Sequence, residues 1–131
     1  TPHIGEFADL FHLEKEEVMR NPLHYALKYA KELKVYIVLK SAHTIIATPN
    51  GQCYINQTGN EGLAQAGSGD LLTGMLTALL AYHCDIFTSL RMGVWLHGHI
   101  ADKLVEHHSK MHMNLEDYPE AINQFFYENG Y

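Results

Sequence analysis

The sequence of 131 residues predicts one α/β domain built in layers. The apolar run 35–39 is rich in β-branched residues and has a lysine on either side, which is typical of a buried strand. Asn50-Gly51 between the β-prone runs 44–47 and 53–55 is a strong hairpin signal. Helical patterns stand before and after these strands, and that arrangement is typical of layered α/β folds.

Two helices are predicted before the first strand. A short apolar pattern over residues 7–11 has the spacing of one side of a helical turn. Asn21-Pro22 marks a helix start, with asparagine as the cap and proline at the first helical position. Apolar residues at helical spacing over 23–33 continue that helix. The strand 35–39 that follows is expected to be parallel and central in its sheet.

A glycine-rich loop and three helices are predicted after the hairpin. Residues 56–69 are polar and carry four glycines, so they form a loop. The helix over 70–82 is apolar around most of its circumference, so we expect it to be deeply buried. A second helix covers 88–108, and a sequence like a capping box at 117–120 precedes a last helix over 121–127.

Charge and composition argue against several classes of partner. Nine Lys and Arg against fifteen Asp and Glu give a net charge of −6, so nothing attracts the whole chain to nucleic acid or anionic membranes. The longest apolar stretch, 71–82, is too short for a bilayer, which needs about 20 residues. Two cysteines and no visible signal peptide favour a cytoplasmic protein. The start at Thr1 indicates a processed chain or a piece of a longer one.

The segment Gly67-Ser68-Gly69-Asp70 opens the predicted buried helix and is the strongest candidate for chemistry. Unpaired N–H groups and the helix dipole make such a start a site for an anion, and glycines let the anion come close. Asp70 could take a proton from a hydroxyl that attacks a bound phosphate. The alternative is that Asp70 only caps the helix and that the glycines form a tight turn.

A polar segment follows the predicted strand at its carboxyl end: Lys40, Ser41, Ala42, His43 and Thr44. In open α/β sheets, ligands bind outside the carboxyl ends of the strands. Lys40 offers a point charge for an anion, and Thr44 offers a hydroxyl. The alternative is an ordinary lysine at a strand end in water.

Histidines give a weaker signal at both ends of the chain. His3 could donate to a phosphate, and Glu6 could orient it or help hold a metal, although a surface histidine in a turn is the simpler alternative. The later cluster comprises His97, His99, His107, His108 and His112. Zinc needs three or four convergent ligands, so we expect solvated histidines and no metal site there.

Three motifs in order carry a family resemblance. They are Thr-Pro-His-x-Gly-Glu, then Val-Leu-Lys-x-x-x-Thr-Ile-Ile-Ala-x-Pro-x-Gly, then Asn-x-Gly-Leu-Ala-x-x-Gly-x-Gly-Asp-Leu-Leu-Thr-Gly. Together with Leu96-His97-Gly98 they resemble the ADP/ATP-dependent NAD(P)H-hydrate dehydratases of the ribokinase-like superfamily, over about residues 1–105. The chain resembles only about the second half of that family's domain.

The resemblance implies a mostly parallel sheet between helices, with a β-hairpin, of which residues 1–131 would form a partial domain. It also implies a lyase reaction. ADP or ATP, with Mg²⁺, would phosphorylate the 6-hydroxyl of hydrated NADH or NADPH, and elimination of phosphate would restore the dinucleotide. The missing half would come from another chain or from a second copy in a homo-oligomer.

The resemblance assigns roles to the candidate residues. Asp70 matches the aspartate that contacts the hydrate and would act as base, and His3 matches a substrate-binding histidine. Residues 40–44 match the adenine-nucleotide segment, and residues 67–69 would bind the nucleotide and stabilise the transferred phosphoryl group. Ser41 departs from the family pattern, in which a glycine usually follows the lysine.

Two other functions stay open from the sequence. A small-molecule kinase of the same superfamily, acting on a sugar or a vitamin-precursor alcohol, would use the same Gly-x-Gly-Asp motif and release a stable phosphorylated alcohol. An inert nucleotide-binding module would bind ADP without turnover. The opening Thr-Pro-His-x-Gly-Glu motif favours the dehydratase.

Overall fold

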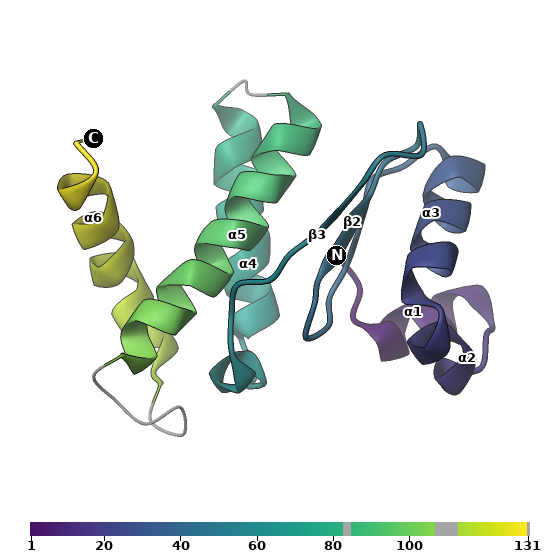
Figure 1. The fold of residues 1–131 in the computed structure, drawn as a ribbon, viewed down its shortest axis with the longest axis horizontal. Coiled ribbons are helices and arrows are strands. Elements are labelled where there is room, and N and C mark those ends of the chain that lie inside the picture. The colour runs from purple at the N-terminus through teal and green to yellow at the C-terminus, as the bar shows by residue number, and fades with distance from the viewer. Residues whose placement is uncertain (83–84, 107–112, 131) are drawn as a thin grey trace.

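The structure is a computed structural model that describes residues 1–82, 85–106 and 113–130. Its elements in chain order are α1 (Ile4–Phe11), α2 (Lys15–Arg20), α3 (Pro22–Leu33), β1 (Ile37–Leu39), β2 (Ile45–Ala47), β3 (Cys53–Ile55), the short 3₁₀ helix η1 (Glu61–Leu63), α4 (Ser68–Ala81), α5 (Ile86–Val105), the 3₁₀ helix η3 (Leu115–Asp117) and α6 (Tyr118–Glu128). Helices α1 to α3 lie on one side of the strands, and α4 and α5 lie on the other (Figure 1). The predicted α/β layering is therefore confirmed.

The three strands form one antiparallel sheet in the order β1-β2-β3. The expectation that the first strand is parallel, in a mostly parallel sheet, is wrong for the described residues. Their one parallel contact is a single bridge between His3 and Lys40. The cause is the short connection, because only residues 40–44 join β1 to β2, whereas a parallel crossover needs about a dozen residues.

Two locally encoded elements form as predicted. The hairpin pairs Ile46 of β2 with Tyr54 of β3, and Gly51 in its turn has a φ of +89°, a conformation that favours glycine. Helix α3 begins at Pro22 as predicted, although Asn21 makes no side-chain cap hydrogen bond. Turn chemistry and helical spacing thus predicted both elements from nearby residues alone.

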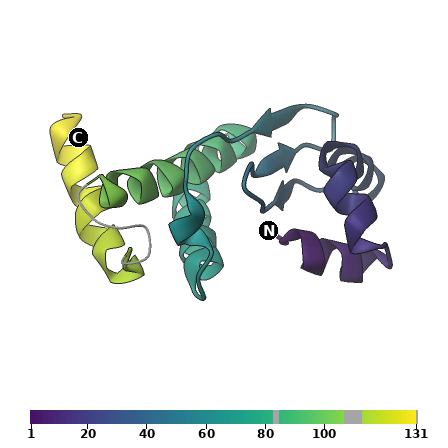
Figure 2. The same cartoon turned by 60° about the horizontal axis from the view of Figure 1, so that its bottom comes forward.

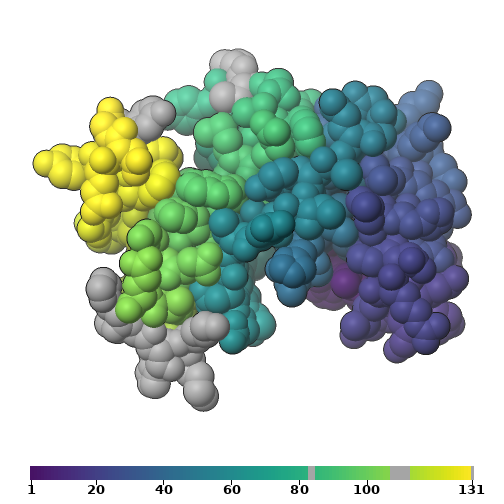
Figure 3. Space-filling view, viewed as in Figure 1, coloured from purple at the N-terminus to yellow at the C-terminus, as the bar shows by residue number. Residues whose placement is uncertain are grey.

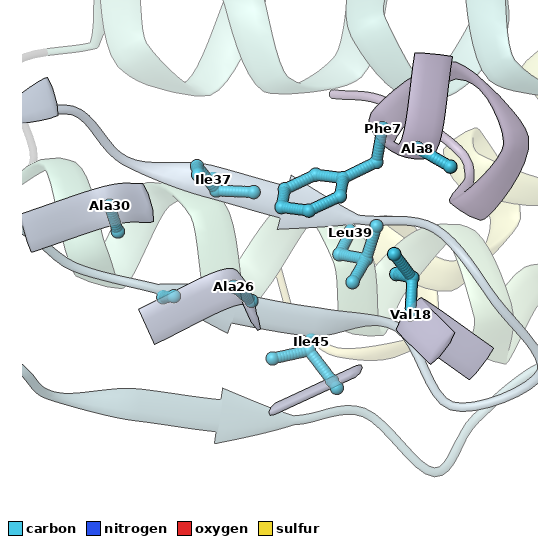
Figure 4. Packing of buried hydrophobic residues seen from close by; sticks show 9 residues of the cluster. Phe7, Ala8, Val18, Ala26, Ala30, Ile37, Leu39 and Ile45 are labelled. Atoms are coloured by element: carbon cyan, nitrogen blue, oxygen red, sulfur yellow. The ribbon is translucent and has the colours of Figure 1, made fainter. Parts of the chain in front are cut away.

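The first core lies between the sheet and helices α1 to α3. Leu39 and Ile37 of β1 pack there against Phe7 of α1 (Figure 4). Val18 of α2 and Ile45 of β2 belong to the same cluster. Phe7, Val18 and Leu39 are fully buried, so this cluster anchors the N-terminal helices on the sheet.

The second core lies on the opposite face of the sheet, because neighbouring strand residues point to opposite sides. Val38 and Ile46 face α4 and α5 there. The helical partners in this cluster are Leu72, Leu76, Leu90 and Val94. The sheet is therefore buried on both faces, and α4 is held at a defined place beside the ends of the strands.

Helix α6 lies at the far end of the molecule from α1 to α3 (Figures 2 and 3). It packs on α5 through a third cluster around the fully buried ring of Tyr118. The predicted capping box at 117–120 is wrong, because Asp117 makes no side-chain cap hydrogen bond. Across the described ranges, every helix is too short or too polar to cross a membrane.

Helix α4 differs from its prediction in two ways. It begins at Ser68, two residues earlier than predicted, because Gly67 adopts a left-handed conformation that starts the helix. It is also less buried than predicted, since only Ser68, Leu72 and Leu76 are buried while Leu80 is 39% exposed. The sheet and α5 cover one face of α4, and part of its apolar surface stays open.

Candidate functional site

A cavity of about 770 Å³ lies where several segments of the chain meet. Residues 40–44 at the end of β1, the loop 56–65, residues 68–69 at the start of α4, and His97 of α5 all contribute to its walls. His3 at the N-terminus also lines it. The chain from β3 to α4 runs alongside α5, which brings these distant segments together (Figures 1 and 2).

The cavity groups most of the predicted site residues. Of these, it contains His3, Lys40, Ser41, Ala42, His43, Thr44, Ser68 and Gly69. Gly67 and Asp70 are exposed and do not line the cavity, but they directly flank two residues that do. The tertiary structure thus brings residues of three sequence motifs together in the wall of one cavity.

The start of α4 has the features of an anion site. Gly67 occupies the cap position with φ +90° and ψ −18°, and no side chain caps the helix. The Ser68 N–H donates to the Gln65 carbonyl at 3.3 Å, and Ser68 and Gly69 at the positive end of the helix dipole line the cavity. A Cβ atom built on Gly69 would lie 3.0 Å from the Lys40 Nζ atom, so the ammonium group reaches the helix start. Dipole and ammonium together favour a bound phosphate.

Lys40 is held beside the N-terminal helix by its neighbours. Its backbone N–H donates to the Pro2 carbonyl at 2.8 Å, and its Nζ atom lies 3.8 Å from the Glu6 carboxylate. The lysine side chain is 24% exposed. A partly buried ammonium with one distant carboxylate keeps donors available for a ligand, so Lys40 fits the predicted role of an anion contact.

His3 and Glu6 form a capping box at the start of α1. The Glu6 N–H donates to His3 Nδ1 at 3.0 Å, and the His3 N–H donates to the Glu6 carboxylate at 2.6 Å. The hydrogen bond from the His3 backbone is the main cause that lowers the pKa of Glu6, with a smaller contribution from Lys40. Glu6 thus orients His3, as predicted, while the His3 backbone pairs with Lys40 in the parallel bridge and the Glu6 carboxylate lies 3.8 Å from the Lys40 Nζ atom.

The turn between β1 and β2 is shaped by its own hydroxyl groups. The Ser41 hydroxyl donates to the His43 carbonyl at 2.9 Å, and the Thr44 hydroxyl donates to the Ser41 carbonyl at 3.3 Å. Ala42 is exposed at this turn. The turn therefore forms a rim of the cavity whose shape is defined before any ligand binds.

The loop after β3 is attached to α5 by polar contacts that the sequence analysis did not predict. The Gly59 N–H and the Asn60 side chain both donate to the Asp102 carboxylate, at 2.8 and 3.0 Å. The Thr58 hydroxyl donates to the Trp95 carbonyl of α5 at 2.9 Å. Asp102 and Trp95 lie about 40 residues along the chain from their partners in the loop, so no local sequence pattern predicts these contacts.

Metal binding is not supported by side chains in the ranges that the structure describes. No group of three or more His, Cys, Asp or Glu residues lies close enough there to hold an ion. His107, His108 and His112 of the late histidine cluster lie outside those ranges. A magnesium ion that binds through nucleotide phosphates needs only one or two protein carboxylates, so it does not require such a group.

The prediction that the histidines of the late cluster are solvated is wrong for His97. Its side chain is only 6% exposed, and the Tyr118 hydroxyl donates to its backbone carbonyl at 2.9 Å. Burial lowers the pKa of His97 to about 4, and a hydrogen bond to the Ser68 backbone opposes this shift only in part. The sequence does carry a signal, because His97 shares the helical stripe of Leu90, Val94 and Ala101.

Acidification from pH 6.5 to about 4 is expected to destabilise the fold through His97. The unfolded chain binds a proton on this ring below its ordinary pKa of 6.5, whereas the folded ring stays neutral down to about 4. The unfolded state is therefore favoured as pH falls through this window, by roughly 3 kcal/mol at most. Urea unfolding of the wild type and His97→Gln at several pH values measures this. Equal pH dependence in both proteins would contradict it.

Comparison with known proteins identifies the family. Residues 1–124 match the profile of a family described as NAD(P)H-hydrate dehydratase. The chain belongs to the NAD(P)H-hydrate dehydratase family. A relative, the bifunctional NAD(P)H-hydrate repair enzyme Nnr of Thermofilum pendens, is 47% identical over 106 residues. That match covers 81% of this chain and 20% of the relative.

Two solved structures support the same fold. An ADP/ATP-dependent NAD(P)H-hydrate dehydratase from Bacillus subtilis, co-crystallized with ATP/Mg²⁺, matches 97% of this chain with a TM-score of 0.92 and 34% identity. A ribokinase-like superfamily protein from Enterococcus faecalis matches with a TM-score of 0.84 and 28% identity. The predicted ribokinase-like fold is confirmed. The chain spans 46% of the Bacillus protein, which is about half.

Proposed function

We propose that this chain forms the nucleotide-binding part of an NAD(P)H-hydrate dehydratase that uses ADP or ATP as phosphoryl donor. The cavity supports this most, because it groups His3, Lys40 and the uncapped start of α4 around one space. The Bacillus relative was co-crystallized with ATP/Mg²⁺, which supports an adenine nucleotide as the ligand. The small number of cysteines fits a reducing compartment, so we propose a cytoplasmic location.

The proposed reaction begins with phosphoryl transfer. The 6-hydroxyl oxygen of the hydrated nicotinamide ring attacks the terminal phosphorus of the nucleotide, and the bond to the bridging oxygen breaks. Asp70, in the first turn of α4, takes the hydroxyl proton. The positive end of α4 and the Lys40 ammonium stabilise the negative charge on the transferred group.

The second step removes the phosphate. The lone pair of the ring nitrogen forms a double bond to C6, and the C6–O bond breaks, so that phosphate leaves with the bonding electrons. Loss of a proton from C5 then restores the dihydronicotinamide ring. With ADP as donor, the products are AMP, inorganic phosphate and NADH or NADPH. His3 is proposed to orient the hydrate, because it lines the cavity while Glu6 holds its ring.

We infer that the site is completed by the part of the family's domain that this chain does not span, whether that part belongs to the same polypeptide, to another chain or to a second copy. The chain spans about half of its Bacillus relative, and α4 leaves Leu80 partly exposed. Asp70 is also exposed beside the cavity, where further residues would enclose it. The hydrate would bind between the two halves.

The test is a turnover assay. The chain, alone and with its complementary half, is incubated with hydrated NADH, ADP and Mg²⁺, and the absorbance of NADH is followed. We expect absorbance to return in step with AMP release. A stable phosphorylated alcohol without NADH would instead indicate a small-molecule kinase. Nucleotide binding without either product would indicate an inert binding module.

Lys40→Met is expected to raise the Kd for ADP–Mg²⁺ by about 10- to 100-fold, because one charge-assisted contact to phosphate is lost. The methionine keeps most of the length of the side chain and removes only the ammonium. Titration calorimetry measures the change. Lys31→Met is the matched control, since Lys31 is exposed on α3 and does not line the cavity. Equal Kd values for both variants would exclude Lys40 as an anion contact.

A further inference from the structure

Asp102 of α5 is a partly buried carboxylate that the proposed reaction does not use. It does not line the cavity, but both of its oxygen atoms hold the loop that forms one wall of it. Its Oδ2 atom accepts the Gly59 N–H at 2.8 Å, and its Oδ1 atom accepts the Asn60 side-chain amide at 3.0 Å. Hydrogen bonds to a carboxylate are stronger than those between neutral groups, so Asp102 fixes this part of the loop firmly.

One face of α5 receives the loop at three positions. Trp95, Gly98 and Asp102 are spaced three and four residues apart, which places them on one face of the helix. The Thr58 hydroxyl donates to the Trp95 carbonyl at 2.9 Å, and a Cβ atom built on Gly59 would lie 3.4 Å from the Gly98 Cα atom. Of these three positions only Asp102 holds the loop through its side chain. A substitution there can therefore weaken the attachment and leave the helix backbone intact.

Asn60 transmits the position of Asp102 to the rest of the wall. Its Nδ2 atom donates to Asp102, and its Oδ1 atom accepts the Gly62 N–H at 3.0 Å, which caps η1. Both polar atoms of the Asn60 side chain thus have partners within the protein. Leu63 and Ala64, which end η1 and follow it, line the cavity. The place where Asp102 holds Asn60 therefore determines where this wall of the cavity begins.

The position of this wall matters for the proposed ligand. The same cavity is lined by residues 59–61 and 63–65 and by Lys40, Ser68 and Gly69 of the proposed anion site. A ligand that contacts both groups needs them at a fixed separation, and a wall that is ordered before binding loses less conformational freedom when the ligand binds.

We propose that Asp102 is a positioning residue for nucleotide binding, which holds the wall formed by residues 59–65 in register with the anion site. It touches no ligand and acts through Gly59 and Asn60. This inference rests on the proposed function and adds to it a residue outside the cavity.

The test exchanges the two side chains that meet. Asp102→Asn turns an amide N–H₂ group towards a hydrogen-bond donor of the loop, and Asn60→Asp places two carboxylates together. The double variant again pairs one amide with one carboxylate and has the net charge of wild type. By titration calorimetry, we expect each single variant to raise the Kd for ADP–Mg²⁺ about tenfold. The double variant should return to within about threefold of wild type.

Charge alone predicts the opposite result for Asp102→Asn, because loss of a negative charge near a phosphate site strengthens binding. The matched control is Asp85→Asn. The Asp85 carboxylate accepts the Thr88 N–H at the start of the same helix and does not line the cavity, so its Kd should stay within about twofold of wild type. Thermal melting of each variant shows that it is folded at the temperature of the titration.

Several outcomes would overturn the proposal. One is a folded Asp102→Asn variant that binds ADP as tightly as wild type or more tightly, and another is a double variant as weak as the single variants. If Asp102→Asn does not fold, Asn60→Ser decides. Serine can still cap η1 but is too short to reach Asp102, so the Kd should rise about threefold, and an unchanged Kd would contradict the proposal. A wild-type chain that binds no ADP at all would instead remove the proposed nucleotide site, and this inference with it.

Discussion

Asp70→Asn is expected to lower kcat for hydrate dehydration by about 100- to 10,000-fold, in whichever assembly shows turnover. Asparagine has nearly the same shape as aspartate but cannot accept the proton of the attacking hydroxyl. The Kd for ADP–Mg²⁺ should stay the same or fall slightly, because a negative charge beside the bound phosphate is removed. The combination of lost turnover and retained binding is the signature of a general base.

The matched control for this change is Asp117→Asn. Asp117 is likewise an exposed carboxylate at a helix start, before α6, and it makes no side-chain cap hydrogen bond. Replacement of the Asp117 carboxylate by an amide should leave kcat unchanged. Steady-state kinetics and titration calorimetry on both variants separate chemistry from binding. Full activity of Asp70→Asn would exclude Asp70 as the base and leave it as a residue of the helix start alone.

Gly98→Ala is expected to destabilise the fold by about 3 kcal/mol and to distort the cavity. A Cβ atom on Gly98 would lie 2.6 Å from both the carbonyl carbon and the carbonyl oxygen of Thr58, and it would also meet the Thr58 hydroxyl. These are mostly backbone atoms, so the loop would have to move. That loop carries Asn56, whose side chain donates to the Thr58 carbonyl at 3.0 Å. The cavity wall would move with it.

Gly74→Ala is the matched control, because it makes the same substitution within another helix. Gly74 is exposed on α4, and a Cβ atom there would meet nothing within 4 Å. Alanine should stabilise this helix by about 1 kcal/mol through its higher helix propensity. Urea unfolding of both variants gives the comparison. If Gly98→Ala is as stable to urea as Gly74→Ala, the Thr58 backbone moves away from the added methyl group without loss of stability, and the prediction is wrong.

Most local elements of this fold could be predicted from the sequence, because nearby residues determine them. Helix α3 and the hairpin follow from Asn21-Pro22 and Asn50-Gly51. Helix α4 follows from its glycine-rich start, and the structure moves that start only to Ser68. The motif residues were also found from sequence, and most of them line one cavity. Their chemical roles stay predictions until the variants are measured.

The sequence by itself determined where most helices and the hairpin form, and which residues offer an ammonium, a carboxylate and a glycine start. Spacing, turn residues and capping act over a few positions, so they can be read along the chain. Only the tertiary structure decided the antiparallel direction of β1, the burial of His97 and the close approach of Gly98 to Thr58. Each of these depends on packing between segments that are distant in sequence or on the path of a connection, and periodicity within one segment carries no information about either.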